Sequence, residues 1–440
     1  MSFSSIPFLW FLAAFLTLYG FCPPLYRRYL LLLGSMVFIA LGSSLTAMGI
    51  ALGAAIVNFF LGIFIQRTSH RKLTLAAAVA INVMVLVTFK LADLKVTGFS
   101  FYTFAFLAYL VDIYREQHEA EYDPSYFGTY ALFFPKFVMG PITRYGEMAA
   151  ELDKPKLSLS GLQNGLENFV TGFAMKVFIA DRLGFLWSDL TQIGFECLPS
   201  ALAWLGAFSF SIQLYIEWQS YTLMAHGIAG MLGYKLPQNF NYPYLARSVS
   251  DFYRRWHMTL TRWFTNYVYI PLGGSRTGTG RTVLNILIVW LLTSLWHGIG
   301  WNFILWGMSL GVLIVIEKLW LGRILEENRI LSHVWVLILI PLTWVCFNIT
   351  KTQELGAYFS RLFPFFGSEG VTSGSNFWRL FWKYSSYLAL GVFFCFPLPE
   401  KLIHRWGKTW IGAVVLAAIF WWAVYVLSQT GDNPFHYANF

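Results

Sequence analysis

Long apolar runs, several of them approaching 20 residues, dominate this chain of 440 residues and limit what it can fold into. A helix of roughly 20 apolar residues spans the ~30 Å hydrocarbon core of a bilayer. Charged residues make up only 12% of the chain, about half of the roughly 25% found in soluble domains, whereas 57% of the residues are hydrophobic. A soluble protein of this size needs more charge to keep its surface in water. The sequence therefore predicts a polytopic membrane protein and excludes aqueous enzymes, disulfide scaffolds and nucleic-acid binders.

The order of the apolar runs predicts an all-α fold with roughly eleven transmembrane helices and further re-entrant or interfacial helices. The first span is expected over residues 7–21, and the run 29–65 is too long for a single crossing. The polar notch at 42–44 divides that run into a helical hairpin. Basic residues flank the hairpin at both ends, so the positive-inside bias places both ends in the cytoplasm. These residues are Arg27, Arg28, Arg67, Arg71 and Lys72.

The rest of the chain divides into shorter apolar runs. Residues 73–87 predict another span, whereas 98–114 and 126–142 contain glycine, proline or charge within the apolar stretch. Such interruptions indicate broken or re-entrant helices, whose freed backbone groups must be satisfied by protein or water. Further apolar stretches lie at 169–179, 201–216, 221–232, 283–296, 303–316, 334–346, 387–396 and 411–427.

Charge and motif content narrow the function. The net charge of +9 comes from Lys and Arg concentrated in short loops, so it indicates membrane topology before it indicates an anionic ligand. The four cysteines are widely separated and lack the spacing of a metal or redox pair. The chain contains no Gly-rich phosphate loop, no Gly-x-Ser-x-Gly elbow and no His-Glu-x-x-His motif. The sequence therefore offers no residues for a metal centre or a covalent hydrolase.

Residues 251–267 predict one amphipathic helix at the membrane interface. Ser250 followed by Asp251 is typical of a helix start, and His257 lies at the edge between the two faces. Aromatic residues along one face and arginines along the other favour the interface. The arginines either anchor the helix on lipid phosphates or form the floor of a cavity for an anionic or thioester-linked substrate. The aromatic face consists of Phe252, Trp256, Leu260, Trp263 and Tyr267, and the polar face of Asp251, Arg254, Arg255, Met258, Arg262 and Asn266.

His297 ends the apolar run 283–297 and is followed by the sequence Gly298-Ile299-Gly300. If Arg281 marks the membrane interface, His297 lies about 24 Å further along a helix that rises ~1.5 Å per residue. That depth is within the ~30 Å hydrocarbon core, where an ionisable group is costly and indicates a functional site. A neutral buried imidazole suits a general base. The alternative is a structural histidine that is hydrogen-bonded to a neighbouring helix.

Two motifs resemble the signatures of the membrane-bound O-acyltransferase family, and most closely its bacterial alginate O-acetylation branch. The first runs from Ser250 to His257 and continues from Tyr267 to Gly274. The second is Leu295-Trp296-His297-Gly298, followed by Trp301 and by Leu305-Trp306-Gly307. The resemblance is dense from about residue 30 to 320, with a core signature region at about 98–320, and it implies a single membrane-embedded domain over residues 1–440. Further similar stretches lie at 98–104, 109–115, 133–135, 140–144 and 237–247.

The resemblance implies a fold around a central tunnel that joins the two faces of the bacterial cytoplasmic membrane. It also implies that an acyl group passes from a cytoplasmic thioester donor, such as acetyl-CoA, to a hydroxyl group outside. His297 matches the essential histidine of the family and His257 its second active-site position. His257 or Asn266 would orient the donor or stabilise the oxyanion. The supporting residues implied by the two motifs are Trp296, Gly298, Arg254, Arg255 and Arg262, of which the arginines would meet donor phosphates or lipid.

Departures from the alginate branch leave the acceptor open. Thr265-Asn266 stands where that branch has Arg-Asp, and residues 217–220 replace its Asp-Phe-Ser-Gly. The leading interpretation is acetyl transfer to a cell-envelope glycan, completed by an extracytoplasmic acetyltransferase partner. D-alanyl transfer from a carrier protein to teichoic acid is the second. A transporter or flippase, whose histidines relay protons, is the alternative from a different class.

Overall fold

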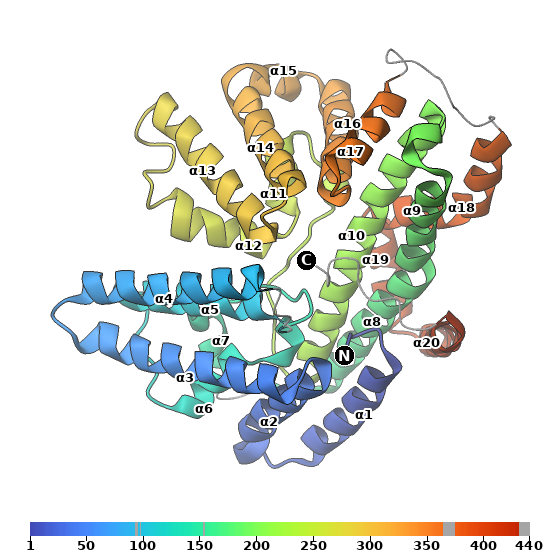
Figure 1. Cartoon of the computed structure of the whole chain (residues 1–440). Coiled ribbons are helices and arrows are strands. Elements are labelled where there is room, and N and C mark those ends of the chain that lie inside the picture. The colour runs from blue at the N-terminus through green and yellow to red at the C-terminus, as the bar shows by residue number, and fades with distance from the viewer. Residues whose placement is uncertain (93–95, 97, 153–154, 364–374, 431–440) are drawn as a thin grey trace. The chain divides into compact units, whose positions relative to one another are not determined.

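The computed structural model describes residues 1–92, 96, 98–152, 155–363 and 375–430. Throughout these residues the chain is helical and contains no strand (Figure 1), which confirms the predicted all-α class. Residues 431–440, which belong to the predicted single domain, lie outside the described part. The chain divides into two compact units. Of the described residues, the first comprises those in 1–173, 221–238 and 416–430, and the second those in 174–220 and 239–415.

The first unit is built from the N-terminal helices. α3 contacts both α4 and α5, and the three lie side by side in Figure 1. The hairpin predicted from the notch at 42–44 is confirmed, because α2 ends at Gly42 and α3 begins at Leu45. The helices are α1 (Ile6–Phe21), α2 (Pro24–Gly42), α3 (Leu45–Arg67), α4 (Arg71–Leu91), α5 (Phe99–Tyr114), α6 (Pro124–Ala131), α7 (Tyr145–Leu152) and α8 (Leu159–Met175).

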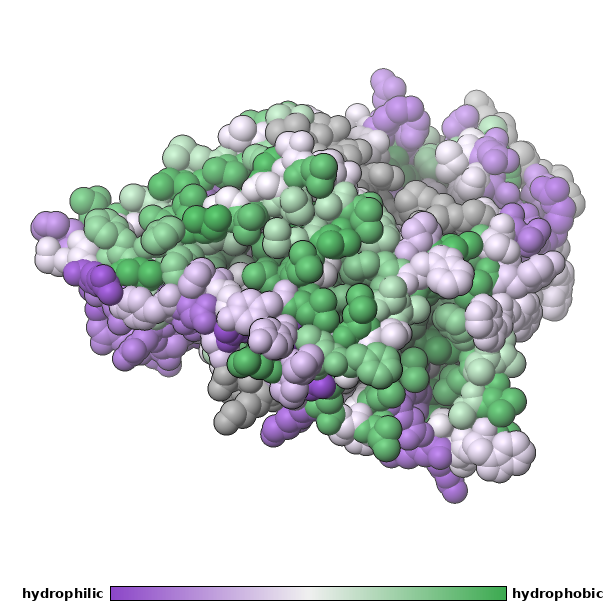
Figure 2. Space-filling view, turned by 90° about the horizontal axis from the view of Figure 1, so that it is seen from below, coloured by the Kyte–Doolittle hydropathy of each residue, from purple (hydrophilic) through white to green (hydrophobic). Residues whose placement is uncertain are grey.

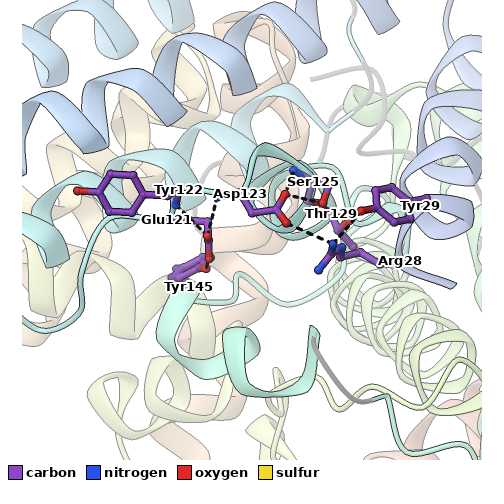
Figure 3. A network of polar contacts seen from close by, with 8 residues as sticks. All are labelled: Arg28, Tyr29, Glu121, Tyr122, Asp123, Ser125, Thr129 and Tyr145. Carbon is purple, nitrogen blue, oxygen red and sulfur yellow. Dashed lines mark hydrogen bonds and ion pairs between the residues drawn. The ribbon is translucent and has the colours of Figure 1, made fainter. Parts of the chain in front are cut away.

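A network of polar contacts joins α2 to the segment around α6 within the first unit (Figure 3). The Arg28 guanidinium forms an ion pair with Asp123 at 3.3 Å. The other carboxylate oxygen of Asp123 accepts from the Ser125 backbone N–H at 2.8 Å and so caps α6. The Tyr145 hydroxyl donates to Glu121. Arg28, one of the basic residues from which the topology is predicted, therefore also holds α2 against the segment around α6.

The second unit contains the signature motifs. Here α13 and α14 form a closely packed antiparallel pair, and α14 also packs on α16 (Figure 1). Its elements are the π-helix η2 (Lys176–Ala180), α9 (Asp181–Ile193), α11 (Val249–Arg255), α12 (Met258–Phe264), η5 (Thr265–Tyr269), α13 (Thr279–His297), α14 (Trp301–Ile316), η6 (Glu317–Leu321), α15 (Gly322–Glu327), α16 (Arg329–Asn348), α17 (Thr352–Leu362), α18 (Ser375–Phe394) and α19 (Leu398–Trp406).

Three helices belong partly to each unit, α8 only through its last two residues, 174–175, and two later helices to a larger extent. α10 (Ser200–Met231) runs without interruption for 32 residues, so the two apolar stretches at 201–216 and 221–232 belong to one helix. The polar residues between those stretches are helical as well, and the Ser220 hydroxyl donates to the Ile216 carbonyl one turn back. The last helix, α20 (Trp410–Thr430), also crosses the boundary between the two sets of residues.

Seven helices of the described chain are long and apolar enough to cross a membrane, or eight if the bent pair Asn376–Phe394 and Leu398–Trp406 forms one span. The chain is therefore a multi-pass membrane protein, but the predicted count of roughly eleven is not confirmed. Apolar side chains such as Phe60 and Met84 are exposed, which suits contact with lipid. Figure 2 shows hydrophobic side chains over much of one face, with hydrophilic residues gathered towards its margins. The seven helices are α2, α3, α4, α13, α14 with its extension to Glu327, α16 and α20.

The two segments predicted to be broken behave differently. Residues 126–142 are indeed interrupted, with α6 ending at Ala131 and a short 3₁₀ helix, η1, following at Phe134–Lys136. Residues 98–114 contain no break, because α5 is continuous over Phe99–Tyr114, so only the re-entrant alternative stays a prediction there. Its buried Asp112 forms an ion pair with Arg144 at 2.9 Å. A distant partner, rather than a break in the helix, accommodates this charge.

Candidate active site

A cavity of about 650 Å³ lies within the second unit, and both predicted histidines are part of its wall. His257 lines it from the connection between α11 and α12, and His297 lines it from the end of α13. The wall also carries charged residues from α11 and from η6. Its apolar part is dominated by the five indole rings of Trp218, Trp256, Trp290, Trp306 and Trp344. A space of this size admits a small organic ligand and offers it two imidazoles.

The prediction of a single helix over 251–267 is wrong, because the helix is interrupted at His257. α11 ends at Arg255, α12 begins at Met258, and His257 between them has a left-handed backbone conformation with φ 44°. The helix also starts earlier than predicted, since the Ser248 side chain is the N-cap and accepts from the Asp251 N–H. The aromatic stripe is nevertheless buried at Phe252, and likewise at Trp256, Leu260 and Trp263. Periodicity located the buried face but not the break.

The interruption of the helix at His257 accompanies a buried position of its side chain, which differs from the one predicted. Sequence periodicity places this residue at the edge of a helix, but its side chain is buried, with only 3% exposed. The imidazole ring packs against Trp218, with 5.0 Å between ring centroids, and its Nδ1 lies 3.1 Å from Oδ1 of Asn239. This connection lies outside the seven candidate spans. Burial lowers the pKa of His257 to about 3, so the ring is neutral at physiological pH.

His297 is the last residue of α13, as predicted, and its side chain is buried in an aromatic enclosure. The centroids of Trp306 and Phe347 lie 4.9 and 5.3 Å from that of the imidazole, both edge to face. The ring of Trp296 lies 4.4 Å away. These contacts leave His297 few orientations, as a group that must meet a reacting atom requires.

Close packing between α13 and α14 fixes the position of His297. A Cβ atom on Gly307 of α14 would lie only 1.9 Å from Oγ of Ser294, one turn before His297. The absence of a side chain at Gly307 therefore lets the two helices approach. Gly298, which follows the histidine, has a similar role, because a Cβ there would lie 2.5 Å from the Phe303 ring.

The remaining predicted site residues differ in their relation to the cavity. Among the described residues, Arg254 lies on the cavity wall, whereas Arg255, Arg262, Asn266, Trp296 and Gly298 do not. Arg255 forms an ion pair with Asp251 at 3.1 Å, and Arg262 is exposed. Asn266 is half-buried in η5, a segment whose residues Thr265 and Tyr269 do reach the cavity. The arrangement therefore separates Arg254 from the other two arginines.

Sequence reasoning missed Glu317, a buried carboxylate on the cavity wall. Its Oε1 accepts from the Val249 N–H at 2.5 Å and from the Trp335 indole N–H at 2.9 Å. Its Oε2 accepts from the backbone N–H and the hydroxyl of Ser250, both at 3.0 Å. Glu317 therefore holds the start of α11 against η6 and α16. The signal in the sequence was a lone acidic residue at the end of an apolar run, which also fits a solvated helix end.

The sequence profile of the membrane-bound O-acyltransferase family matches residues 66–360, a range that contains both histidines and the whole cavity wall. The chain belongs to this family. The match confirms the predicted resemblance and identifies the protein as an acyltransferase of the membrane rather than a transporter or flippase. In the described residues no three His, Cys, Asp or Glu side chains are grouped as metal ligands would be.

Curated relatives within the family are named for transfer to alginate, to peptidoglycan or to teichoic acid. The "Probable alginate O-acetylase" of Azotobacter vinelandii is 32% identical over 400 residues, covering 83% of this chain and 78% of the relative. The peptidoglycan O-acetyltransferase of Helicobacter pylori is 31% identical over 387 residues, covering 75% and 72%. The teichoic acid D-alanyltransferase of Streptococcus thermophilus is 26% identical over 257 residues, covering 54% and 60%.

Proposed function

We propose that this acyltransferase passes acetyl groups from a cytoplasmic thioester, such as acetyl-CoA, across the bacterial inner membrane for O-acetylation of an extracytoplasmic polysaccharide or cell-wall glycan. The observation that carries this proposal is the cavity wall shared by His257 and His297. Relatives named for O-acetylation of alginate and of peptidoglycan align over three quarters or more of the chain, which supports the acetyl group over other acyl groups.

In the proposed reaction His297 is the general base. One nitrogen of its imidazole accepts the proton of the acceptor hydroxyl while the hydroxyl oxygen attacks the carbonyl carbon of the thioester. A carbon–oxygen bond forms, the carbon–sulfur bond breaks, and the leaving thiolate takes the proton from the imidazolium. The oxyanion that develops on the carbonyl requires a hydrogen-bond donor. The sequence offers His257 and Asn266 for this role or for orienting the donor.

We assign the phosphate groups of the donor to the basic residues of the cavity wall. Arg254 and Lys318 both lie on it, and a guanidinium suits a phosphate through paired hydrogen bonds. Arg255 and Arg262 lie off the wall and are assigned to the stability of α11 and to lipid headgroups. Trp296 and Gly298 serve the reaction indirectly by fixing the place of His297.

The proposed path joins the two membrane faces. We propose that donor and acceptor approach His297 from opposite sides through a tunnel, and that an extracytoplasmic acetyltransferase partner completes the transfer to the glycan. We also propose that α1, α5 and α10 cross the membrane beside the candidate spans, which gives roughly eleven crossings. The first two are apolar helices of 16 residues, and α10 has 32 residues, enough for ~48 Å at ~1.5 Å per residue.

The proposal is tested by glycan acetylation in cells that express single variants. His297→Ala is expected to abolish acetylation while the protein still accumulates in the membrane. His70→Ala is the matched control, because His70 is exposed at the start of α4, outside the cavity wall, and should leave acetylation unchanged. Full acetylation by His297→Ala would refute the proposal.

D-alanyl transfer is the second candidate within the family. It is supported by the match to teichoic acid D-alanyltransferases, which covers about half of this chain. The same cells distinguish the two, because a D-alanyltransferase would change the ester-linked D-alanine of the envelope and leave its acetyl content unaltered.

A further inference from the structure

His257 is held by residues 239–241, of which Asn239 and Phe240 are buried, and this segment pairs with the break between α11 and α12. The backbone carbonyl of Asn239 accepts from the Met258 N–H at 2.8 Å, and the Asn241 N–H donates to the Arg255 carbonyl at 2.9 Å. Asn239 itself is fully buried. A left-handed backbone costs a residue with a side chain roughly 1–2 kcal/mol, so the conformation of His257 requires support from elsewhere in the fold. These hydrogen bonds supply it.

The side chain of Asn239 also determines which nitrogen of His257 carries the proton. Oδ1 of Asn239 accepts from the backbone N–H of Thr259 at 3.3 Å and from its hydroxyl at 2.9 Å. A backbone N–H can only donate, so the atom that it meets must be the amide oxygen rather than the amide nitrogen. That oxygen lies 3.1 Å from Nδ1 of His257. Because an amide oxygen can only accept, Nδ1 must carry the proton and Nε2 the lone pair.

We propose that Asn239 is a positioning residue that holds His257 as the Nδ1–H tautomer, so that the second histidine of the site accepts a hydrogen bond or a proton through Nε2. This inference rests on the proposed function, in which His257 meets the substrates. An imidazole with a lone pair on Nε2 cannot donate through that atom to an oxyanion. His257 is therefore assigned to a substrate N–H or O–H, and the oxyanion must receive its hydrogen bond from another group.

Two parts of the substrates have the chemistry that this acceptor requires. The amide N–H groups of a pantetheine thioester and the hydroxyl group of the acceptor can both donate to a neutral imidazole nitrogen. Steady-state kinetics separates them, because His257→Phe has no accepting nitrogen and should raise the KM of the substrate that His257 contacts. A higher KM for the thioester assigns the amide, and a higher KM for the acceptor assigns the hydroxyl.

The tautomer is measured by nitrogen NMR on the full-length protein, labelled with ¹⁵N-histidine and reconstituted in lipid nanodiscs. The His257→Gln spectrum identifies the signals of His257. In the wild type at pH 7 the proton is expected on Nδ1 and the lone pair on Nε2. The inference is overturned if Nε2 carries the proton or if the ring is an imidazolium. The NMR measurement needs no turnover, so a wrong tautomer can be distinguished from a failure of the proposed function. The latter would appear as absent acyl transfer by the wild type.

Variants of Asn239 and Thr259 distinguish a positioning role of Asn239 from a purely structural one. Asn239→Ala removes the acceptor, so the two tautomers should mix and transfer should fall roughly 10- to 100-fold, the range found for hydrogen-bond partners that orient metal-bound histidines. Asn239→Asp keeps an acceptor oxygen and should restore the tautomer and most of the transfer at pH 8. Thr259→Val is the matched control, because it removes a hydrogen bond to the same oxygen and should leave the tautomer unchanged. An unchanged tautomer in Asn239→Ala would reduce Asn239 to a structural role and overturn the inference.

Discussion

Replacing Glu317 with glutamine tests how the cavity wall is held in place. The carboxylate accepts four hydrogen bonds, from Val249, Trp335 and both polar groups of Ser250. Glutamine has nearly the same shape but only one accepting oxygen. That oxygen should turn to the Val249 and Trp335 N–H groups, which can only donate. The new NH₂ group then faces Ser250, whose hydroxyl can rotate to accept but whose backbone N–H cannot.

The expected loss of stability arises because the amide NH₂ and the Ser250 backbone N–H are both donors and cannot form a hydrogen bond with each other. A buried donor that loses its acceptor costs about 1–3 kcal/mol, and the loss of a charged acceptor places Glu317→Gln in the upper part of this range. At the start of α11 the negative charge also interacts favourably with the helix dipole, a smaller contribution of about 0.3–1 kcal/mol. For a chain of this size, with an entropy of unfolding of about 2 cal/mol/K per residue, such a loss corresponds to a fall in Tm of roughly 2–4 °C.

The assay is thermal unfolding of the purified protein in detergent, with Glu327→Gln as the matched control. Glu327 forms only an exposed ion pair with Arg323, at 2.8 Å, so its loss should change stability by less than about 0.5 kcal/mol. Ser250→Ala should fall between the two variants, because it removes the hydroxyl and keeps both carboxylate oxygens of Glu317. If Glu317→Gln unfolds at the same temperature as Glu327→Gln, the carboxylate does not hold α11 and the reasoning is wrong.

Three further predictions concern the helix pair, the first unit and the second histidine. Gly307→Ala should lower acyl transfer at least tenfold, because the added Cβ would lie 1.9 Å from Oγ of Ser294. Gly280→Ala is the control, since its added Cβ would meet no described atom within 4 Å beyond its chain neighbours and its own helix backbone, and it should retain full transfer in the same assay. Asn58→Ala should lower the stability of the α3–α4 pair by about 0.6–1.7 kcal/mol, measured by thermal unfolding, since it removes a pair of reciprocal amide hydrogen bonds. His257 should remain neutral from pH 8 down to pH 5 in an NMR titration, because burial lowers its pKa to about 3, where half of the rings would be protonated. A midpoint near the ordinary 6.5 would contradict its burial.

The membrane class and the helical hairpins could be predicted from the sequence because they depend on local composition. Runs of apolar residues set the positions of α3 and α4, and the polar notch at 42–44 set the turn before α3. The errors occur where a distant contact changes the local outcome. Asp112 stays inside a continuous α5 because Arg144, far along the chain, neutralises it. No pattern within 98–114 reveals that partner.

The candidate site shows the same division. His297 could be found from its depth in an apolar run and from the family motif, and the structure buries it where that reasoning expects. The break at His257 could not be found, because the residue before it and the residue after it both fit helical periodicity. Asn239, which stabilises the break, lies 18 residues away in the sequence. The buried role of Glu317 likewise depends on N–H groups of α11 that periodicity does not place nearby.

Transfer of a radiolabelled acetyl group from a thioester, measured on purified protein in liposomes, tests the central claim most directly. The donors compared are acetyl-CoA and a carrier-bound acetyl thioester, each with wild-type protein, His297→Ala and the His70→Ala control. Wild type and His70→Ala should release free thiol and pass the label to an acceptor hydroxyl, whereas His297→Ala should lose at least 100-fold of this rate. Equal rates of thioester consumption by wild type and His297→Ala would contradict the account.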